Sequence, residues 1–294
     1  MLKRLAAIDA GSNAIRLMVG DVIHTPIGPL VKKVGFYRLP FPIGQDVFCS
    51  GEIGRHYQRL LADAFHGMAH WLRVLSPDYT DGVATSAFRT ASNGHQMVAW
   101  VSALTGVPLR IIDGLEEAKL IVAACPPRTT QELVLYVDIG GGSTELSAYQ
   151  GDHCLLQTSV PVGALRPHVT GVGGEATAAK GDELSQVLSG LPRGDWVVMG
   201  TGGNVSKLPG MLGYKEGLPI RPKKITMLWQ QLGGLSIEER ILRYGLKPDR
   251  AESIVPALAI LNRVLALLKV RQVLVPKCGV VDGLIHTMAL EVLA

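Results

Sequence analysis

The chain has 294 residues, of which 47% are hydrophobic and 18% are charged, and its formal net charge is +4 at pH 7. This length and apolar content are typical of a globular protein with about two domains, and they exclude a disordered chain. The mild positive charge, without a dense run of lysine and arginine, suits an anionic ligand and argues against nucleic acid as a partner.

Short apolar runs alternate with helical patterns along the chain, which indicates an α/β fold. Strands are predicted, in chain order, at residues 5–8, 17–22, 82–85, 109–112, 133–137, 145–149, 196–199 and 272–275. Helices are predicted within 53–74, over 116–124 and over 251–268. The last of these is the most apolar region, but Glu252, Asn262 and Arg263 favour a buried helix over a membrane span.

The N-terminus and the cysteines bear on the cellular compartment. The opening MLKRLAAIDAG has only a short apolar stretch that runs into a turn, so it is predicted to be a first strand and not a signal peptide. The four cysteines (Cys49, Cys125, Cys154 and Cys278) are scattered and form no CxxC pair. This spacing argues against a zinc site and predicts free thiols that act as small apolar groups. We therefore expect a cytoplasmic protein.

Two stretches of the chain resemble each other. Residues 6–17 read AAIDAGSNAIRL, and residues 135–146 read LYVDIGGGSTEL. Each has an apolar strand, then Asp-x-Gly with small polar residues, then a second strand. The two aspartates, Asp9 and Asp138, lie about one domain length apart. This pattern predicts a duplicated strand–turn–strand unit, one in each of two related lobes, with a ligand cleft between the lobes.

These two turns have the residues to bind phosphate and a metal ion. Glycines in a tight turn let backbone N–H groups face an anion. Asp9 and Asp138, each at the end of a strand, can coordinate a hard cation directly or through water, and Glu145 is close enough in sequence to serve the same ion. Side-chain donors at the turns are Ser12, Asn13, Ser143 and Thr144.

Other phosphate-binding motifs are excluded. The chain has no GxxxxGK[ST] sequence, so it is not a P-loop protein. The GTGGN at residues 200–204 has Val205 where a GxGxxG motif needs its last glycine, so a Rossmann dinucleotide site is not supported.

The two hairpins and further motifs resemble the exopolyphosphatase / guanosine pentaphosphate phosphatase (Ppx/GppA) family, part of the superfamily of actin, sugar kinases and heat-shock ATPases. The motifs are IDAGSNAIRL (8–17), ATSAFRTASNG (84–94), IIDGLEEAKLI (111–121), VDIGGGSTEL (137–146), GTGGNVSKL (200–208), DRAESIVPAL (249–258) and VPKCGVVDGLI (275–285). The resemblance implies two ribonuclease H-like, actin-like ATPase lobes with the ligand cleft between them. The first lobe would cover 1–118, optionally joined by a C-terminal helix at 283–294, and the second would cover 119–294.

The resemblance also implies roles for individual residues. Glu117, in the Glu-Glu-Ala motif, matches the catalytic base, although a glutamate there also stabilises a helix N-terminus. Asp138 and Glu145 match acidic residues that position metal or the attacking water, and Arg89 matches an arginine that clamps phosphate. Lys119 departs from the family pattern, because arginine is usual there. The implied phosphate-binding residues are Ser12, Asn13, Gly140, Gly141, Gly142, Ser143 and Thr144, and the implied metal ligands are Asp138, Glu145 and Asp9.

The function that the resemblance implies is hydrolysis of a terminal phosphoanhydride. The substrate would be inorganic polyphosphate or guanosine pentaphosphate, the cofactor Mg²⁺ or another divalent cation, and the assembly a homodimer. Two alternatives stay open. A phosphate or nucleotide sensor would bind without turnover, and a small-molecule kinase of the same superfamily would have no use for a water-activating Glu117.

Overall fold

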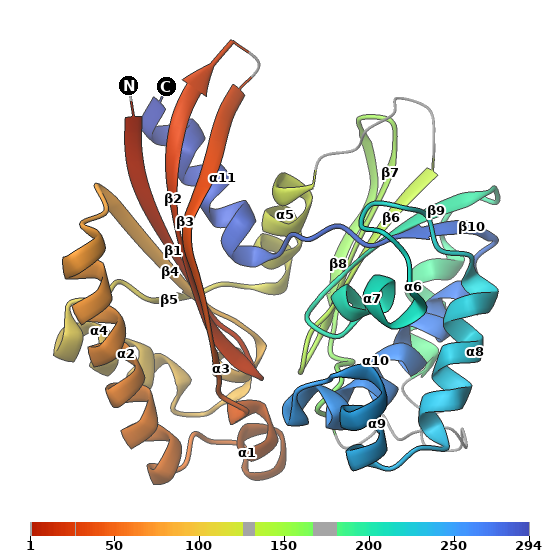
Figure 1. Ribbon diagram of the computed structural model, residues 1–294, viewed down its shortest axis with the longest axis horizontal. Coiled ribbons are helices and arrows are strands. Elements are labelled where there is room, and N and C mark those ends of the chain that lie inside the picture. Colours follow the sequence, from red (N-terminus) through yellow and green to blue (C-terminus); the bar gives the residue numbers. More distant parts are fainter. Residues whose placement is uncertain (1, 27, 126–132, 167–180, 294) are drawn as a thin grey trace. The chain divides into compact units, whose positions relative to one another are not determined.

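The computed structural model describes residues 2–26, 28–125, 133–166 and 181–293 (Figure 1). The chain divides into two compact units. The first unit combines residues 1–124 with 278–294, and the second comprises residues 125–277.

The first unit contains a five-stranded sheet in the order β3-β2-β1-β4-β5. Strand β1 is central and almost wholly buried from residue 5 onward, because small and branched apolar residues fit a strand that is covered on both faces. It pairs antiparallel with β2 and parallel with β4. The elements are β1 (Leu2–Ala10), β2 (Ala14–Thr25), β3 (Gly28–Pro40), α1 (Ile43–Ser50), α2 (Arg55–Leu75), β4 (Tyr79–Ala84), α3 (Ser86–Thr90), α4 (Gly94–Thr105), β5 (Arg110–Ile111), α5 (Gly114–Ala124) and α11 (Val280–Leu293).

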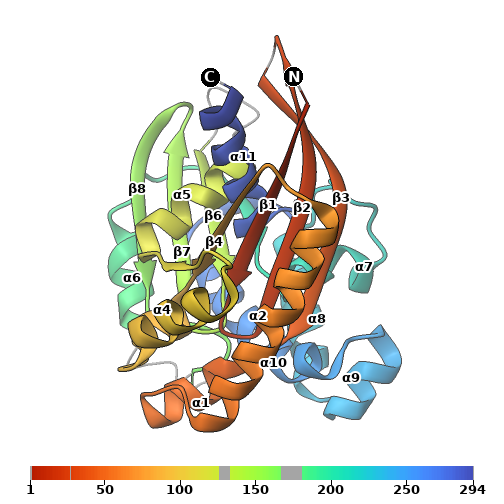
Figure 2. The same ribbon diagram turned by 90° about the vertical axis from the view of Figure 1, so that its left-hand side faces the viewer.

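Helices cover both faces of this sheet. Figure 2 shows α2 and α4 packed across one face, where Leu61 and Phe65 of α2 join Ile8 and Leu17 of the sheet in one core. Helix α11 packs against β1 and α5, and it also contacts β2 and β3. The C-terminal helix is therefore part of the first unit, far from it in sequence but packed on its central strand.

The second unit contains a five-stranded sheet in the order β10-β9-β6-β7-β8. Its core lies between this sheet and the helices α6, α8 and α10, with Trp196, Leu258 and Leu261 fully buried. The elements are β6 (Leu133–Ile139), β7 (Thr144–Gln150), β8 (His153–Val160), α6 (Gly181–Ser189), β9 (Trp196–Thr201), a 3₁₀ turn (Val205–Lys207), α7 (Leu208–Leu212), α8 (Pro222–Gly233), α9 (Ile237–Tyr244), α10 (Pro248–Leu267) and β10 (Val270–Leu274).

The two sheets share one topology. In each, the central strand (β1 or β6) pairs antiparallel with the next strand along the chain, and that strand pairs antiparallel with a third. A later strand (β4 or β9) then joins the other edge of the central strand in parallel. The predicted α/β fold with two related lobes is confirmed.

Helix α10 tests the prediction for the most apolar region. It buries Ala251, Ile254 and Leu258 completely, so it is a core helix of the second unit. Among the helices of the described ranges, none has the length and apolarity that a membrane crossing requires.

The cysteines differ from the prediction. Cys125 and Cys278 are disulfide-bonded, and Cys49 and Cys154 are free but exposed. The prediction of four thiols acting as small apolar groups is therefore wrong. The scattered spacing of the cysteines carries no signal of which ones are bonded, because bonding depends on tertiary distance.

Gly283 is required by the contact between α11 and α5. A Cβ at this position would lie 1.9 Å from the carbonyl oxygen of Leu120, so the two helix backbones approach too closely for any side chain. We expect Gly283→Ala to lower the free energy of unfolding by about 1–3 kcal/mol, the usual cost of overpacking. Denaturant titration measures this loss. Gly279→Ala is the control, because a Cβ there meets nothing within 4 Å, and an equal loss in both variants would contradict the explanation.

Candidate active site

Two of the predicted catalytic residues meet inside the first unit. Arg89, near the end of α3, donates through Nη1 to Oε2 of Glu117 at 2.9 Å and to the carbonyl oxygen of Ile112 at 2.8 Å. Glu117 lies in the first turn of α5 and its side chain is 8% exposed. A buried carboxylate needs a charged or hydrogen-bonding partner, and Arg89 supplies one. The sequence motifs predict that both residues belong to the site, but they carry no signal of this contact.

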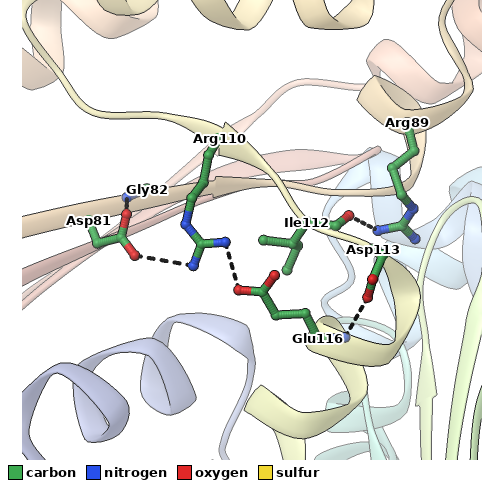
Figure 3. A network of polar contacts seen from close by, with 7 residues as sticks. All are labelled: Asp81, Gly82, Arg89, Arg110, Ile112, Asp113 and Glu116. Carbon is green, nitrogen blue, oxygen red and sulfur yellow. Dashed lines mark hydrogen bonds and ion pairs between the residues drawn. The ribbon is translucent and has the colours of Figure 1, made fainter. Parts of the chain in front are cut away.

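The neighbouring Glu116 has a different environment, shown in Figure 3. Its carboxylate accepts a 2.6 Å hydrogen bond from Arg110, which also contacts Asp81. Its backbone N–H donates to the carboxylate of Asp113 at 2.7 Å, which caps the start of α5. Burial alone would lower the pKa of Arg110, but the hydrogen bond that Arg110 donates to Glu116 and the charge of Asp81 raise it above its usual value. Glu116 therefore serves an ion pair at the half-exposed end of the helix, whereas Glu117 is buried.

The first hairpin turn follows β1. The N–H of Gly11 donates to the carbonyl oxygen of Ala14 at 3.1 Å and closes the turn. Ser12 and Asn13, both predicted to bind phosphate, accept backbone hydrogen bonds through their carbonyl oxygens from the segment around the start of α1. The segment that enters α1 thus holds this turn in place.

Asp9 faces Arg16 across the same hairpin, and the two form an ion pair. Burial raises the pKa of Asp9, and the Arg16 guanidinium opposes that shift. Arg16 was not predicted as a site residue. Its signal was available, because it stands seven positions after Asp9, as Glu145 stands seven positions after Asp138.

The second hairpin turn, residues 140–143, is closed in the same way, with the N–H of Gly140 donating to the carbonyl oxygen of Ser143 at 2.9 Å. We call residues 140–143 the glycine turn. Thr144, predicted to bind phosphate, is fully buried, and its hydroxyl donates to the carbonyl oxygen of Val162 at 2.6 Å. Ser143 is 5% exposed. The Thr144 side chain therefore holds the turn to the segment that follows β8.

Asp138 and Glu145 are direct cross-strand neighbours on β6 and β7. Each has a carboxylate oxygen within 4.8 Å of one on the other, and both side chains are buried. Each carboxylate also accepts a hydrogen bond from the next strand of the sheet. Thr201 of β9 donates to Asp138 at 2.7 Å, and Ser159 of β8 donates to Glu145 at 2.8 Å, so the four side chains form a row across the sheet. Registered neighbours point to the same face of a sheet, so the row presents two carboxylates held by two hydroxyls.

The two repeats therefore differ at one decisive position. Where the first repeat has Arg16 opposite Asp9, the second has Glu145 opposite Asp138. Two carboxylates this close repel each other, and a divalent cation relieves the repulsion. Carboxylate oxygens are the ligands that Mg²⁺ prefers, so the donor set of the second repeat fits such an ion.

Tyr136 lies two residues before Asp138, and its side chain is 1% exposed. Its hydroxyl has no hydrogen-bond partner within the described ranges. Burial, and to a lesser extent the nearby Tyr149, raises the pKa of Tyr136 to about 12. We expect Tyr136→Phe to increase the free energy of unfolding by about 1 kcal/mol, because it removes a buried polar atom without a partner.

Thermal and denaturant unfolding measure this gain. Tyr149→Phe is the control, because the Tyr149 hydroxyl has a hydrogen bond with Cys154 that this change would remove. A gain in the Tyr149 variant, or a loss in the Tyr136 variant, would contradict the assignment.

The Ppx/GppA phosphatase family matches residues 56–171, a range that includes Arg89, Glu117, Asp138 and Glu145. An exopolyphosphatase from Cytophaga hutchinsonii ATCC 33406 is 21% identical over 98% of each chain, with a TM-score of 0.84. The Ppx/GppA family member from Aquifex aeolicus is 20% identical over 99% of each chain, with a TM-score of 0.79.

A third solved structure, an exopolyphosphatase-like protein, is 22% identical, covers 100% of this chain and 99% of its own, and has a TM-score of 0.86. At these identities the solved structures establish a shared fold. The Ppx/GppA phosphatase family matches residues 56–171, and the solved structures share the fold over almost the whole chain, so this is the family that the chain resembles.

Proposed function

We propose that this protein is a metal-dependent phosphatase that releases the terminal phosphate of inorganic polyphosphate, with guanosine pentaphosphate as a second substrate. The observation that carries the proposal is the cross-strand pair of Asp138 and Glu145 beside the glycine turn. The carboxylate pair suits a hard cation, and the backbone amides of the glycine turn suit phosphate oxygens. The relative from Cytophaga hutchinsonii is an exopolyphosphatase, which supports polyphosphate as the first substrate to test.

In this proposal Asp138 and Glu145 hold Mg²⁺ or another divalent cation. Asp9 was also predicted as a ligand, but its carboxylate is shared with Arg16, so we assign it a weaker role, through water. When bound, the ion neutralises phosphate charge and favours departure of the leaving oxygen.

Glu117 acts as the general base. It takes a proton from a water molecule as the water oxygen bonds to the terminal phosphorus, while the bond from that phosphorus to the bridging oxygen breaks. Arg89 holds Glu117 through Nη1, and its planar guanidinium has the geometry that binds phosphate oxygens. Backbone amides of the glycine turn stabilise the charge that develops on the phosphoryl oxygens. Ser12 and Asn13 are proposed to contact a neighbouring phosphate group.

The test is phosphate release from long-chain polyphosphate and from guanosine pentaphosphate, with Mg²⁺ and after its removal by chelation. We expect release that requires the cation and is faster with polyphosphate. Binding of both compounds without release would favour a sensor, and phosphate transfer from ATP to a small acceptor would favour a kinase. Light scattering of the purified protein tests the predicted homodimer.

A further inference from the structure

The segment that follows β8, residues 162–166, folds back along the glycine turn. The backbone N–H of Ala164 donates to the carbonyl oxygen of Gly140 at 3.0 Å, and the N–H of Leu165 donates to that of Gly141 at 2.8 Å. The Nε of Arg166 donates to the carbonyl oxygen of Gly142. Three consecutive carbonyl groups of the turn are therefore bound by one short segment, which we call the clamp segment.

These three bonds fix the direction of the amide groups as well. In a trans peptide the C=O of one residue and the N–H of the next point in opposite directions. Since the carbonyl groups of residues 140–142 point toward the clamp segment, the N–H groups of residues 141–143 point away from it. Consecutive N–H groups that face one way form an anion-binding concavity.

Gly163 permits this approach. A Cβ at Gly163 would lie 2.5 Å from the carbonyl carbon and oxygen of Gly141, and 2.5 Å from the carbonyl carbon of Gly142. No side chain fits at that distance without moving the turn, because the obstructing atoms are backbone. The hydroxyl of Thr144 adds a second attachment, to the carbonyl oxygen of Val162.

We propose that the clamp segment is a positioning element for phosphate binding, and that Gly163 is its essential residue. The segment binds the carbonyl face of the glycine turn, and we assign the backbone amides of Gly141 and Gly142, on the opposite face, to the substrate. This inference rests on the proposed function. It adds a role for residues 162–166, which the sequence motifs did not mark.

Gly163→Ala tests the proposal. We expect kcat/KM for polyphosphate to fall at least about tenfold, because displaced amides lose contact with the charged phosphoryl group. We also expect faster amide hydrogen exchange in residues 140–144, with exchange in the helices of the second unit unchanged. Gly210→Ala is the matched control in the same unit, because a Cβ at Gly210 meets nothing within 4 Å.

A second variant distinguishes a loss of phosphate positioning from a folding defect. Arg166→Gln removes the Nε donor to Gly142 without adding bulk, and we expect a smaller fall in kcat/KM, about two- to fivefold, with a smaller fall in Tm than in Gly163→Ala. The proposal is overturned if both variants keep wild-type kcat/KM, or if exchange in residues 140–144 is unaffected in Gly163→Ala.

The failure of this inference is distinguishable from failure of the proposed function. If wild-type protein releases no phosphate, the proposed function fails, and calorimetry with inorganic tripolyphosphate then tests the clamp segment. A tenfold weaker affinity in Gly163→Ala than in Gly210→Ala would support the positioning role. Equal affinity in the two variants, or no binding to the wild-type protein, would overturn it.

Discussion

Replacing Glu117 by glutamine is expected to reduce kcat for phosphate release by about a thousandfold, within the range of roughly 10²–10⁴ that a general base contributes. Glutamine has nearly the same size and keeps an oxygen that can accept the hydrogen bond from Arg89, so the local geometry should survive. It cannot take a proton from water at neutral pH. Initial-rate measurements with polyphosphate at saturating Mg²⁺ give kcat directly.

The adjacent Glu116 offers a matched control for this experiment. Glu116→Gln makes the same chemical change one residue away, on a carboxylate that is 40% exposed and paired with Arg110. We expect its kcat to stay within about twofold of wild type, because an exposed ion pair contributes at most about 1 kcal/mol to stability. If Glu117→Gln keeps more than a tenth of the wild-type kcat, Glu117 is not the base. If both variants lose activity equally, the loss comes from disturbing α5.

The fold was largely predictable where strands and helices had a clear apolar pattern. The central strands β1 and β6 are continuous apolar runs, and both were predicted, at 5–8 and 133–137. The edge strands β3 and β8 were missed. Every residue of strand β3 is half-buried or exposed, and the strand contains glycine, lysine and arginine, so its sequence has no uniform apolar signal. Its strand conformation depends on pairing with β2, which is a tertiary effect.

The site was predictable as a set of residues but not as a set of contacts. The repeated Asp-x-Gly pattern located both hairpins, and the observed register then explains why position seven after each aspartate faces it. Arg16 and its ion pair with Asp9 were not predicted, because the Asp-x-Gly pattern alone does not mark the residue at that offset. Thr201 was also missed, because the contact of this residue with Asp138 joins strands 63 positions apart in sequence.

Asp138→Asn is expected to remove most of the increase in phosphate release that Mg²⁺ causes. The substitution keeps the oxygen that accepts the hydrogen bond from Thr201, but it halves the negative charge of the pair that Asp138 forms with Glu145. We expect kcat/KM for polyphosphate to fall by about 10²–10³, because cation neutralisation of phosphate charge is a large part of catalysis in phosphoryl transfer. The Mg²⁺ concentration for half-maximal activity should rise as well.

Stability gives a second readout that does not depend on turnover. A ligand that binds only the folded protein stabilises it by about 2.7 kcal/mol at 100 times its Kd, so Mg²⁺ should raise the Tm of the wild-type protein. Adding Mg²⁺ over the same concentration range should barely shift the Tm of Asp138→Asn. Without metal, the variant should be at least as stable as wild type, because the repulsion between two neighbouring carboxylates is gone.

Asp152→Asn, an exposed position in the same unit, is the control and should keep the full Mg²⁺ response. A normal Mg²⁺ shift in Asp138→Asn would place the metal elsewhere and leave Asp138 as a hydrogen-bond partner of Thr201.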